Sequence, residues 1–197
     1  NLSFPEAVEF LARRVGMELP EQADDHESRR RARMLALNRD SARYFHDQLS
    51  TPGAQIAREY IAKRQISKKM VTAFGLGFAP DGWSGLIDAM HAKGYTDYEL
   101  FDAGLVRRGK SGGYYDTFRG RLMFPIINQR GETVGFGGRI LGDGEPKYLN
   151  SPVLYGLNFA GPAIRQAGKA VLLEGYMDVI GCHQAGVEYT VAPLGTS

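Results

Sequence analysis

The stretch that decides the fold is Val171-Leu172-Leu173-Glu174-Gly175-Tyr176-Met177-Asp178-Val179-Ile180. An apolar run ends at a carboxylate and a glycine, and a helical pattern of apolar residues begins at once. This order predicts a buried strand that ends near Glu174 and leads directly into a helix. Residues 189–193 read as a second buried strand. A strand–helix–strand unit of this kind indicates the α/β class, whose ligands gather at the carboxyl ends of the strands.

Two carboxylates follow this predicted strand. Asp178 comes four residues after Glu174, about one helical turn, so the two side chains can lie close together. Carboxylates at such a corner suit Mg²⁺ (or Mn²⁺), a hard cation that takes oxygen ligands and keeps several waters. An acidic residue at a helix N-terminus is also favoured by the helix dipole alone. The local pattern leaves both interpretations open.

Composition bounds the class of protein. With 197 residues, 43% hydrophobic and 23% charged, the chain is typical of one large globular domain, or one domain with part of another. A net charge of +2 does not indicate a nucleic-acid partner, so any basic patch must be local. The single cysteine, Cys182, excludes a multi-cysteine zinc site within this chain. No apolar run approaches the roughly 18 residues that span a bilayer, which predicts a cytoplasmic protein without a membrane partner.

Local patterns give the remaining organisation. They predict helices at 25–49, 54–63 and 157–166, and strands at 74–79, 121–127 and 132–141. Ser67, Ser84 and Thr96 are predicted helix caps, the last in a capping box with Glu99. Both ends of the sequence look cut, so we expect a piece of a longer protein. We also expect the strand at 189–193 to leave an exposed apolar edge that promotes self-association.

A glycine-rich segment and several cations suggest a phosphate site. Gly135-Phe136-Gly137-Gly138-Arg139 lies within a predicted strand, where glycines indicate a β-bulge or the close approach of another backbone or a ligand. Arg139 can hold a phosphate bidentately, Lys147 and Asn150 follow it, and Arg64 belongs to a separate basic group. Each alone is an ordinary surface residue. Together with the carboxylate pair they describe a cationic groove with a metal at its base, suited to phosphoryl transfer.

The order of motifs along the chain resembles that of the bacterial DNA primase family (DnaG type). The matching segments are Phe78-Ala79-Pro80-x-Gly82-Trp83, Arg119 to Ile126, Gly135 to Arg139, Pro146-Lys147-Tyr148-Leu149-Asn150-Ser151-Pro152, Glu174 to Asp178 and Leu194-Gly195-Thr196-Ser197. The resemblance implies an α+β catalytic-core subdomain with a mixed sheet at residues 25–167. It implies the opening βαβ of a TOPRIM domain at 168–197. Residues 1–24 would be a helix and linker that follow a zinc-binding module absent from this sequence.

The resemblance also implies roles for individual residues. Glu174 and Asp178 match the family's first acidic pair, near the catalytic Mg²⁺. Arg64, Arg139 and Lys147 match basic positions of the template and nucleotide groove, and Asn150 shares the motif of Lys147. Two features depart from the family pattern. A segment with a further lysine is missing between Ser-Pro and Leu-Tyr-Gly, and the Asp-x-Asp metal motif of TOPRIM domains would follow residue 197.

Three functions are compatible with these observations. The first is a primase that joins ribonucleoside triphosphates on a single-stranded DNA template, with a replicative helicase bound through a region absent here. The second is a non-catalytic fragment that binds single-stranded nucleic acid, since one acidic corner offers few metal ligands. The third is another TOPRIM enzyme, such as a topoisomerase or nuclease, which would explain the acidic corner but not the glycine-rich and Lys-Tyr-Leu-Asn-Ser-Pro segments. We expect the 197 residues alone to make no primers and to bind single-stranded DNA weakly.

Overall fold

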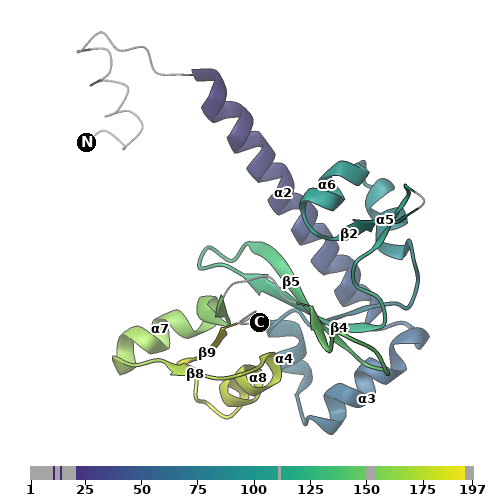
Figure 1. Cartoon of the computed structure of the whole chain (residues 1–197). Helices are drawn as coiled ribbons and strands as arrows, with labels where there is room; N and C mark the ends of the chain where they lie inside the picture. The colour runs from purple at the N-terminus through teal and green to yellow at the C-terminus, as the bar shows by residue number, and fades with distance from the viewer. Residues whose placement is uncertain (1–10, 12–13, 15–20, 111, 150–153, 194–197) are drawn as a thin grey trace. The chain divides into compact units, whose positions relative to one another are not determined.

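The computed structural model describes residues 11, 14, 21–110, 112–149 and 154–193. Contacts between Cα atoms divide the chain into two units, residues 1–34 and residues 35–197. In the first unit the described part is mainly the beginning of helix α2 (Glu21–Gln48), which matches the helix predicted at 25–49. The second unit contains the rest of α2 and all other described helices and strands, which Figure 1 shows.

Helices form the first part of the second unit. Leu37 and Phe45 of α2 are buried, and the helix is followed by a turn in which the Thr51 hydroxyl donates to the Gln48 carbonyl at 2.7 Å. Ser67 caps the helix at Lys68–Ala73 as predicted, because its side chain accepts a hydrogen bond from the Met70 amide. These elements are the 3-10 turn η1 (Pro52–Ala54), helix α3 (Gln55–Lys63) and helix α4 (Lys68–Ala73).

A four-stranded sheet in the order β1-β4-β5-β6 lies at the centre (Figure 1). Its strands are β1 (Gly77–Ala79), β4 (Arg121–Ile127), β5 (Thr133–Ile140) and β6 (Tyr148–Leu149). The predicted hairpin between β4 and β5 is confirmed, and Asn128 closes its turn by accepting from the amides of Arg130 and Glu132. We expected a mixed sheet here. All described strand pairs of this sheet are antiparallel instead.

The strand predicted at 74–79 is shorter than its alternating sequence suggests. Phe74 is the C-cap of α4, and Gly75 has a φ of 62°, the left-handed conformation that commonly ends a helix. Only Gly77 to Ala79 pair with β4. The apolar residues of the whole segment are nevertheless buried. The alternation of apolar residues and glycines at 74–79 therefore reflects burial, and only its second half forms a strand.

A small lobe separates β1 from β4 in the sequence. It contains α5 (Gly85–His91), α6 (Asp97–Asp102), β2 (Val106–Arg108) and β3 (Tyr114–Asp116). The predicted capping box of Thr96 and Glu99 is confirmed at the start of α6. The prediction for Ser84 was incomplete: its hydroxyl donates to Asp88, and Asp116 accepts from the first free amides of α5.

The C-terminal part contains the predicted strand–helix–strand unit. Its elements are β7 (Leu154–Tyr155), α7 (Leu157–Ala167), β8 (Val171–Leu172), α8 (Tyr176–Gln184) and β9 (Thr190–Pro193). The strands form a mixed sheet in the order β7-β9-β8, with β8 and β9 parallel. The α/β class is therefore confirmed.

Two expectations about these strands were wrong. The strand before Glu174 is not buried, since Val171 and Leu172 are 38% and 66% exposed. The reason is that β8 is the edge strand and pairs with β9 alone among the described strands. Residues 189–193 do not form an exposed edge, because β7 pairs with β9 on its other side. The free apolar edge thus lies at β8.

One hydrophobic core joins the two sheets. Buried side chains of η1 and α3, the central sheet and α8 contact one another in a single cluster. Phe124 of β4, Tyr155 of β7 and Tyr176 of α8 lie at its centre, with Tyr176 stacked on Phe124 at 4.3 Å between ring centroids. The segments predicted to carry chemistry are therefore held in one packed body. None of the described helices is long and apolar enough to cross a membrane.

Candidate functional site

The acidic corner, residues 174–178, connects β8 to α8. Glu174 follows the strand, Gly175 is the helix N-cap, and Asp178 lies in the first turn. Both carboxylates are exposed. Asp178 turns back over the corner, because its Oδ2 atom lies 3.2 Å from the point where a Cβ at Gly175 would be. The two acidic residues are thus at the same strand-to-helix corner, as predicted.

The corner supplies part of a metal site. Mg²⁺ is commonly held by one or two carboxylates together with water and substrate phosphates, and two exposed carboxylates beside a strand end fit that donor set. The described residues contain no group of three or more metal-binding side chains. Favourable interaction of Asp178 with the α8 dipole also fits its position in the first turn. Both interpretations from the sequence therefore remain compatible with the geometry.

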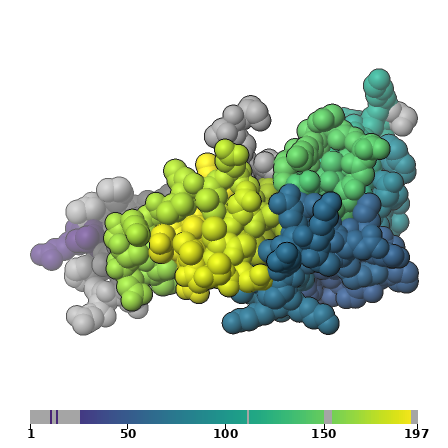
Figure 2. All heavy atoms as spheres, turned by 90° about the horizontal axis from the view of Figure 1, so that it is seen from below, coloured from purple at the N-terminus to yellow at the C-terminus, as the bar shows by residue number. Residues whose placement is uncertain are grey.

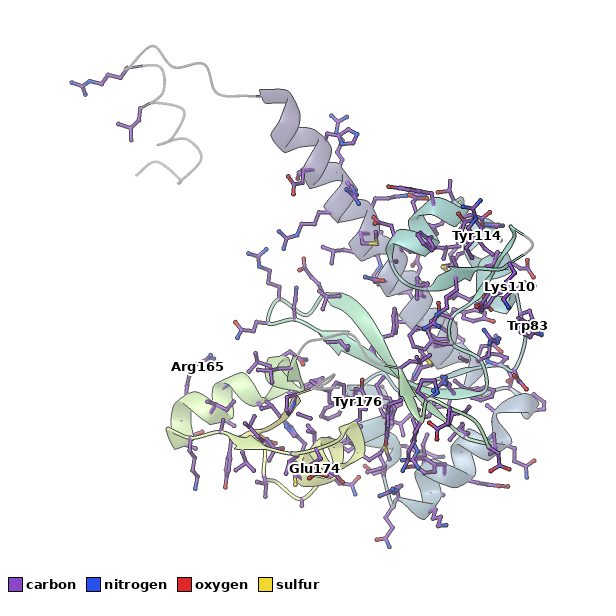
Figure 3. The ribbon with its side chains drawn as sticks, viewed as in Figure 1. Trp83, Lys110, Tyr114, Arg165, Glu174 and Tyr176 are labelled. Carbon is purple, nitrogen blue, oxygen red and sulfur yellow. The ribbon has the colours of Figure 1, made fainter. Side chains whose placement is uncertain are left out.

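Tyr176 anchors the acidic corner to the central sheet (Figure 3). Its side chain is almost fully buried, stacked on Phe124 and edge-on to Tyr155 at 4.7 Å between centroids. Burial raises the pKa of its phenol, so the ring is neutral. A Cβ at Gly137 would lie 1.8 Å from the Tyr176 hydroxyl oxygen, so only glycine leaves room for this ring. The sequence did not predict this contact.

The glycine-rich segment of β5 is thereby explained. The register irregularity between β4 and β5 lies at Ile126 and Ile127, away from Gly137 and Gly138. Gly138 faces the other side of the strand, where a Cβ would lie 2.7 Å from the Phe118 ring. Neither a bulge nor a ligand accounts for these two glycines: aromatic side chains approach the strand from both faces.

Arg139 lies on the same sheet face as the Tyr176 contact, because residues 137 and 139 of a strand point to the same side. Its Nη1 donates to the hydroxyl of Tyr148, its cross-strand partner in β6, at 2.8 Å. Its guanidinium carbon also lies 4.5 Å from the centroid of the Tyr60 ring. Tyr148 in turn lies 5.9 Å from Tyr176, measured between centroids. The acidic corner and Arg139 are therefore connected through adjacent aromatic rings.

Arg64 comes to the same place from helix α3. It is the C-cap residue of α3, and its guanidinium carbon lies 5.5 Å from the centroid of Tyr60, one helical turn before it. Two of the predicted groove residues, Arg64 and Arg139, thus share one aromatic ring. Tyr60 was not predicted from the sequence, although its i, i+4 spacing from Arg64 indicates that a helix would bring the two side chains together.

Lys147 is exposed next to Tyr148, at the start of β6. Its backbone is held by the buried Arg121, whose guanidinium donates to the carbonyls of Gly138, Pro146 and, at 3.4 Å, Lys147. Burial, followed by repulsion from neighbouring arginines, lowers the pKa of Arg121. Arg121 therefore has a structural role: its hydrogen bonds fix the position of the backbone at Lys147. Asn150, the remaining predicted site residue, lies outside the described residues.

A side-chain amide joins the turn after Arg64 to helix α8. Gln184 donates to the Gln65 carbonyl at 2.8 Å and accepts from the Ser67 amide at 2.7 Å. Gln65 is the one described non-glycine residue with a positive φ, 55°, and its carbonyl is held in that conformation. Figure 2 shows the yellow C-terminal segment directly against the blue segment that contains α3 and α4. Helix α8 is thus tied to the turn beside Arg64 as well as to the sheet.

A second group of aromatic and basic side chains lies in the small lobe. Trp83 is 66% exposed, and the Arg119 guanidinium carbon lies 4.3 Å from the centroid of its ring and 5.1 Å from that of Tyr115. Arg119 also donates to the Asp116 carbonyl. Figure 3 shows Trp83 well separated from Glu174. We call Trp83, Tyr115 and Arg119 the Trp83 cluster; sequence reasoning noted two of its residues within motifs but did not predict the cluster.

Asp116 positions the helix beneath this cluster. Its carboxylate is buried and accepts from the amides of Leu86 and Ile87, at 2.8 and 3.2 Å. Burial raises the pKa of Asp116, and these two hydrogen bonds oppose part of the rise. Because the Asp116 amide also donates to the Trp83 carbonyl, the same residue fixes the backbone at Trp83.

Comparison with known proteins identifies one family. The family model described as the N-terminal domain of the DNA primase catalytic core matches residues 44–155. The DNA primase of Clostridium acetobutylicum is 40% identical over 210 residues, an alignment that covers 100% of this chain and 34% of that protein. The chain thus spans about a third of the length of this curated relative.

Solved structures give the same result. A DnaG primase catalytic domain bound to single-stranded DNA superposes with a TM-score of 0.79 at 38% identity, covering 86% of this chain and 58% of that one. A TM-score of 0.79 at 38% identity is also found for the RNA polymerase domain of Mycobacterium tuberculosis primase DnaG, solved in complex with a double-stranded DNA that has a 6-nucleotide overhang. That match covers 84% of this chain and 55% of the other.

Proposed function

The chain belongs to the bacterial DNA primase family of the DnaG type, and from this premise we propose that it forms part of an enzyme that synthesises short RNA primers on single-stranded DNA. Residues 25–167 would be the N-terminal subdomain of the catalytic core, and residues 168–197 the start of a TOPRIM domain. The single observation that supports the proposal most is the sheet face on which Arg64 and Arg139 meet at Tyr60 while Tyr176 attaches the acidic corner.

The proposed reaction is a nucleotidyl transfer in which a primer 3′-hydroxyl attacks a ribonucleoside triphosphate and pyrophosphate leaves. Mg²⁺ (or Mn²⁺) held by Glu174 and Asp178 would activate the hydroxyl and neutralise charge on the phosphates. Arg139 offers a planar fork that grips phosphate oxygens, and Lys147 a mobile point charge. Tyr176 keeps the carboxylates at a fixed place relative to these cations, which is what positional catalysis requires.

We assign single-stranded DNA to two surfaces. Arg64, Arg139 and Lys147 would contact phosphates of the template or of the nucleotide, with Asn150 beside them. The Trp83 cluster offers what a sequence-tolerant single-strand contact needs, namely an exposed aromatic face for stacking and a guanidinium next to it. A relative's catalytic domain has been solved with single-stranded DNA, which supports this substrate class. A replicative helicase would bind through another region of the whole protein.

The test of the catalytic proposal is Glu174→Gln in the full-length enzyme. The change removes a charge at the metal and leaves the cationic surface intact, so we expect primer synthesis to be abolished while binding to single-stranded DNA is nearly unchanged. Glu188→Gln, at an exposed carboxylate before β9, is the matched control and should keep full activity. Primer synthesis by the Glu174 variant within about tenfold of the wild type, a barrier change of only about 1.4 kcal/mol, would reject the assignment.

A binding role without catalysis is the second candidate for the 197 residues taken alone. The described residues contain no cluster of three metal-binding side chains, whereas two-metal catalysis needs several ligands from different strand ends. We therefore expect the isolated chain to bind single-stranded DNA weakly and to make no primers. Template-dependent ribonucleotide incorporation by the purified chain, lost when a chelator is added, would contradict this.

A further inference from the structure

We propose that Tyr60 is a positioning residue for phosphate recognition: its ring holds the guanidinium groups of Arg139 and Arg64 in place before a phosphate arrives. This inference rests on the proposed function and adds a residue to its cationic surface. The phosphate could belong to the DNA backbone or to a nucleotide, and the experiment below separates the two.

The contacts of the Tyr60 ring carry the argument. The guanidinium carbons of Arg139 and Arg64 lie 4.5 and 5.5 Å from its centroid, within the range of cation–π attraction. The two arginines come from different elements, a strand of the central sheet and the end of α3. Tyr60 is the side chain that both touch. Its position on α3 therefore sets the distance between two cations that are remote in the sequence.

The two cations lack the counter-charges that would make this a structural arrangement. In the described part of the chain neither Arg64 nor Arg139 forms an ion pair with a carboxylate. Their guanidinium carbons share one ring and are therefore no farther apart than about a Debye length, about 10 Å, so their mutual repulsion is only partly screened. An anion bound between or beside them would relieve that repulsion. The ring keeps the two charges together in the absence of the anion.

The ring of Tyr60, and not its hydroxyl, accounts for these contacts. The hydroxyl is buried and has no hydrogen-bond partner among the described residues, which costs stability. The ring is only partly buried and packs at the border of the core. A leucine would fill this border with apolar surface but would offer no ring to the two guanidinium groups. The two contacts therefore require an aromatic ring at this position, whether or not it carries the hydroxyl.

The experiment compares Tyr60→Leu with Tyr60→Phe, each alone and combined with Arg139→Lys. Affinity is measured at low salt for a thymidine oligonucleotide and, separately, for ATP, and folding is checked by urea unfolding. We expect Tyr60→Leu to weaken binding about fivefold and Tyr60→Phe to change it less than about twofold, since phenylalanine keeps the ring face. A lysine lacks the planar group that stacks on a ring, while Arg64 keeps its contact with Tyr60, so in the Arg139→Lys background Tyr60→Leu should weaken binding clearly less than it does in the wild type.

The outcomes distinguish this inference from the proposed function. An effect on the oligonucleotide alone assigns the pair to the DNA backbone, and an effect on ATP alone assigns it to the nucleotide. An equal loss from Tyr60→Leu with and without Arg139→Lys would overturn the inference, because Tyr60 would then not act through Arg139. If Arg139→Ala leaves both affinities unchanged, the proposed groove fails instead.

A second readout needs no ligand. The NMR resonance of the Arg139 Nε–H should be shifted by the Tyr60 ring current in the unliganded wild type. It should keep that shift in Tyr60→Phe and lose part of it in Tyr60→Leu, where the Tyr148 ring, 5.5 Å from the Arg139 guanidinium carbon, remains as the other source of ring current. An unshifted resonance in the wild-type chain would refute the positioning role even if binding were too weak to measure.

Discussion

Replacing Gly137 with alanine tests whether Tyr176 fixes the acidic corner to the sheet. The new Cβ would lie 1.8 Å from the Tyr176 hydroxyl oxygen and 2.2 Å from the ring carbon that bears it. Either the strand and helix α8 move apart, or the ring leaves its place on Phe124. Overpacking of this kind typically costs about 1–3 kcal/mol. Expelling the ring would expose most of about 200 Å² of buried surface, which is worth up to about 5 kcal/mol.

The protein will take the less costly route, so we expect Gly137→Ala to lower the free energy of unfolding by about 2–3 kcal/mol, the upper part of the range for overpacking, because the clash is with an almost fully buried ring. Alanine also restricts the unfolded chain more than glycine does, and this effect offsets less than about 1 kcal/mol of the lost stability. Gly181→Ala is the matched control. Gly181 lies inside α8 with nothing within 4 Å of the added Cβ, so the same chemical change should stabilise the protein by about 1 kcal/mol.

Urea unfolding, followed by circular dichroism, measures both variants. The clash should also depend on the ring: in a Tyr176→Leu background, Gly137→Ala should cost much less, a non-additivity expected of side chains in contact. Tyr176→Phe should rescue little, because the ring carbon at 2.2 Å remains. An unfolding free energy for Gly137→Ala within about 0.5 kcal/mol of the wild type would refute the proposed anchor, since substitutions free of such a clash fall in that range.

Three further predictions concern charge and exposed rings. Arg139→Ala and Lys147→Ala should each weaken single-stranded DNA binding and reduce its salt slope by about one, and an unchanged slope for both would remove them from the DNA surface. Trp83→Ala should weaken the same binding by about 1–3 kcal/mol with little loss of stability, whereas Tyr98→Ala, an equally exposed ring, should not. Burial raises the folded-state pKa of Asp116 above its ordinary 3.8, so the folded protein takes up this proton at higher pH than the unfolded chain. The stability of the wild type relative to Asp116→Asn should therefore rise as pH falls through the raised pKa, and urea titrations showing the opposite trend would contradict the burial argument.

Much of the fold could be predicted because its signals are local. The helices at 54–63 and 157–166, the β4–β5 hairpin and the Thr96 capping box depend on periodicity and on neighbouring residues, and the structure contains all of them. The strand ends were harder to predict. Residues 74–79 alternate because they are buried, yet Gly75 stops the pairing. Which strand lies at an edge depends on pairing partners distant in the sequence, so the exposure of β8 could not be predicted.

The charged residues of the candidate site could be proposed from the sequence, but the aromatic residues that hold them in place could not. Glu174 and Asp178 stand out because they follow a predicted strand end, and Arg139 and Lys147 because of the glycine-rich strand and the family resemblance. Their roles stay predictions. The groups that hold these residues in place are aromatic rings, and a tyrosine in a sequence does not indicate which charged group it will contact. The contact of the Tyr60 ring with Arg64 is local, whereas its contact with Arg139 could be recognised only after the tertiary structure was known.

The core that joins the helices before the central sheet to helix α8 has a consequence for how the chain is made. Leu49, Ile61 and Phe74 leave the ribosome long before Met177 and Ile180, with which they share one core. Until α8 has been synthesised, the apolar surface of the early helices lacks its final cover. Such surface is prone to aggregation and is what chaperones bind. Biosynthesis thus includes a vulnerable interval whose length is set by the rate of translation through about a hundred intervening residues, at about 5–20 residues per second.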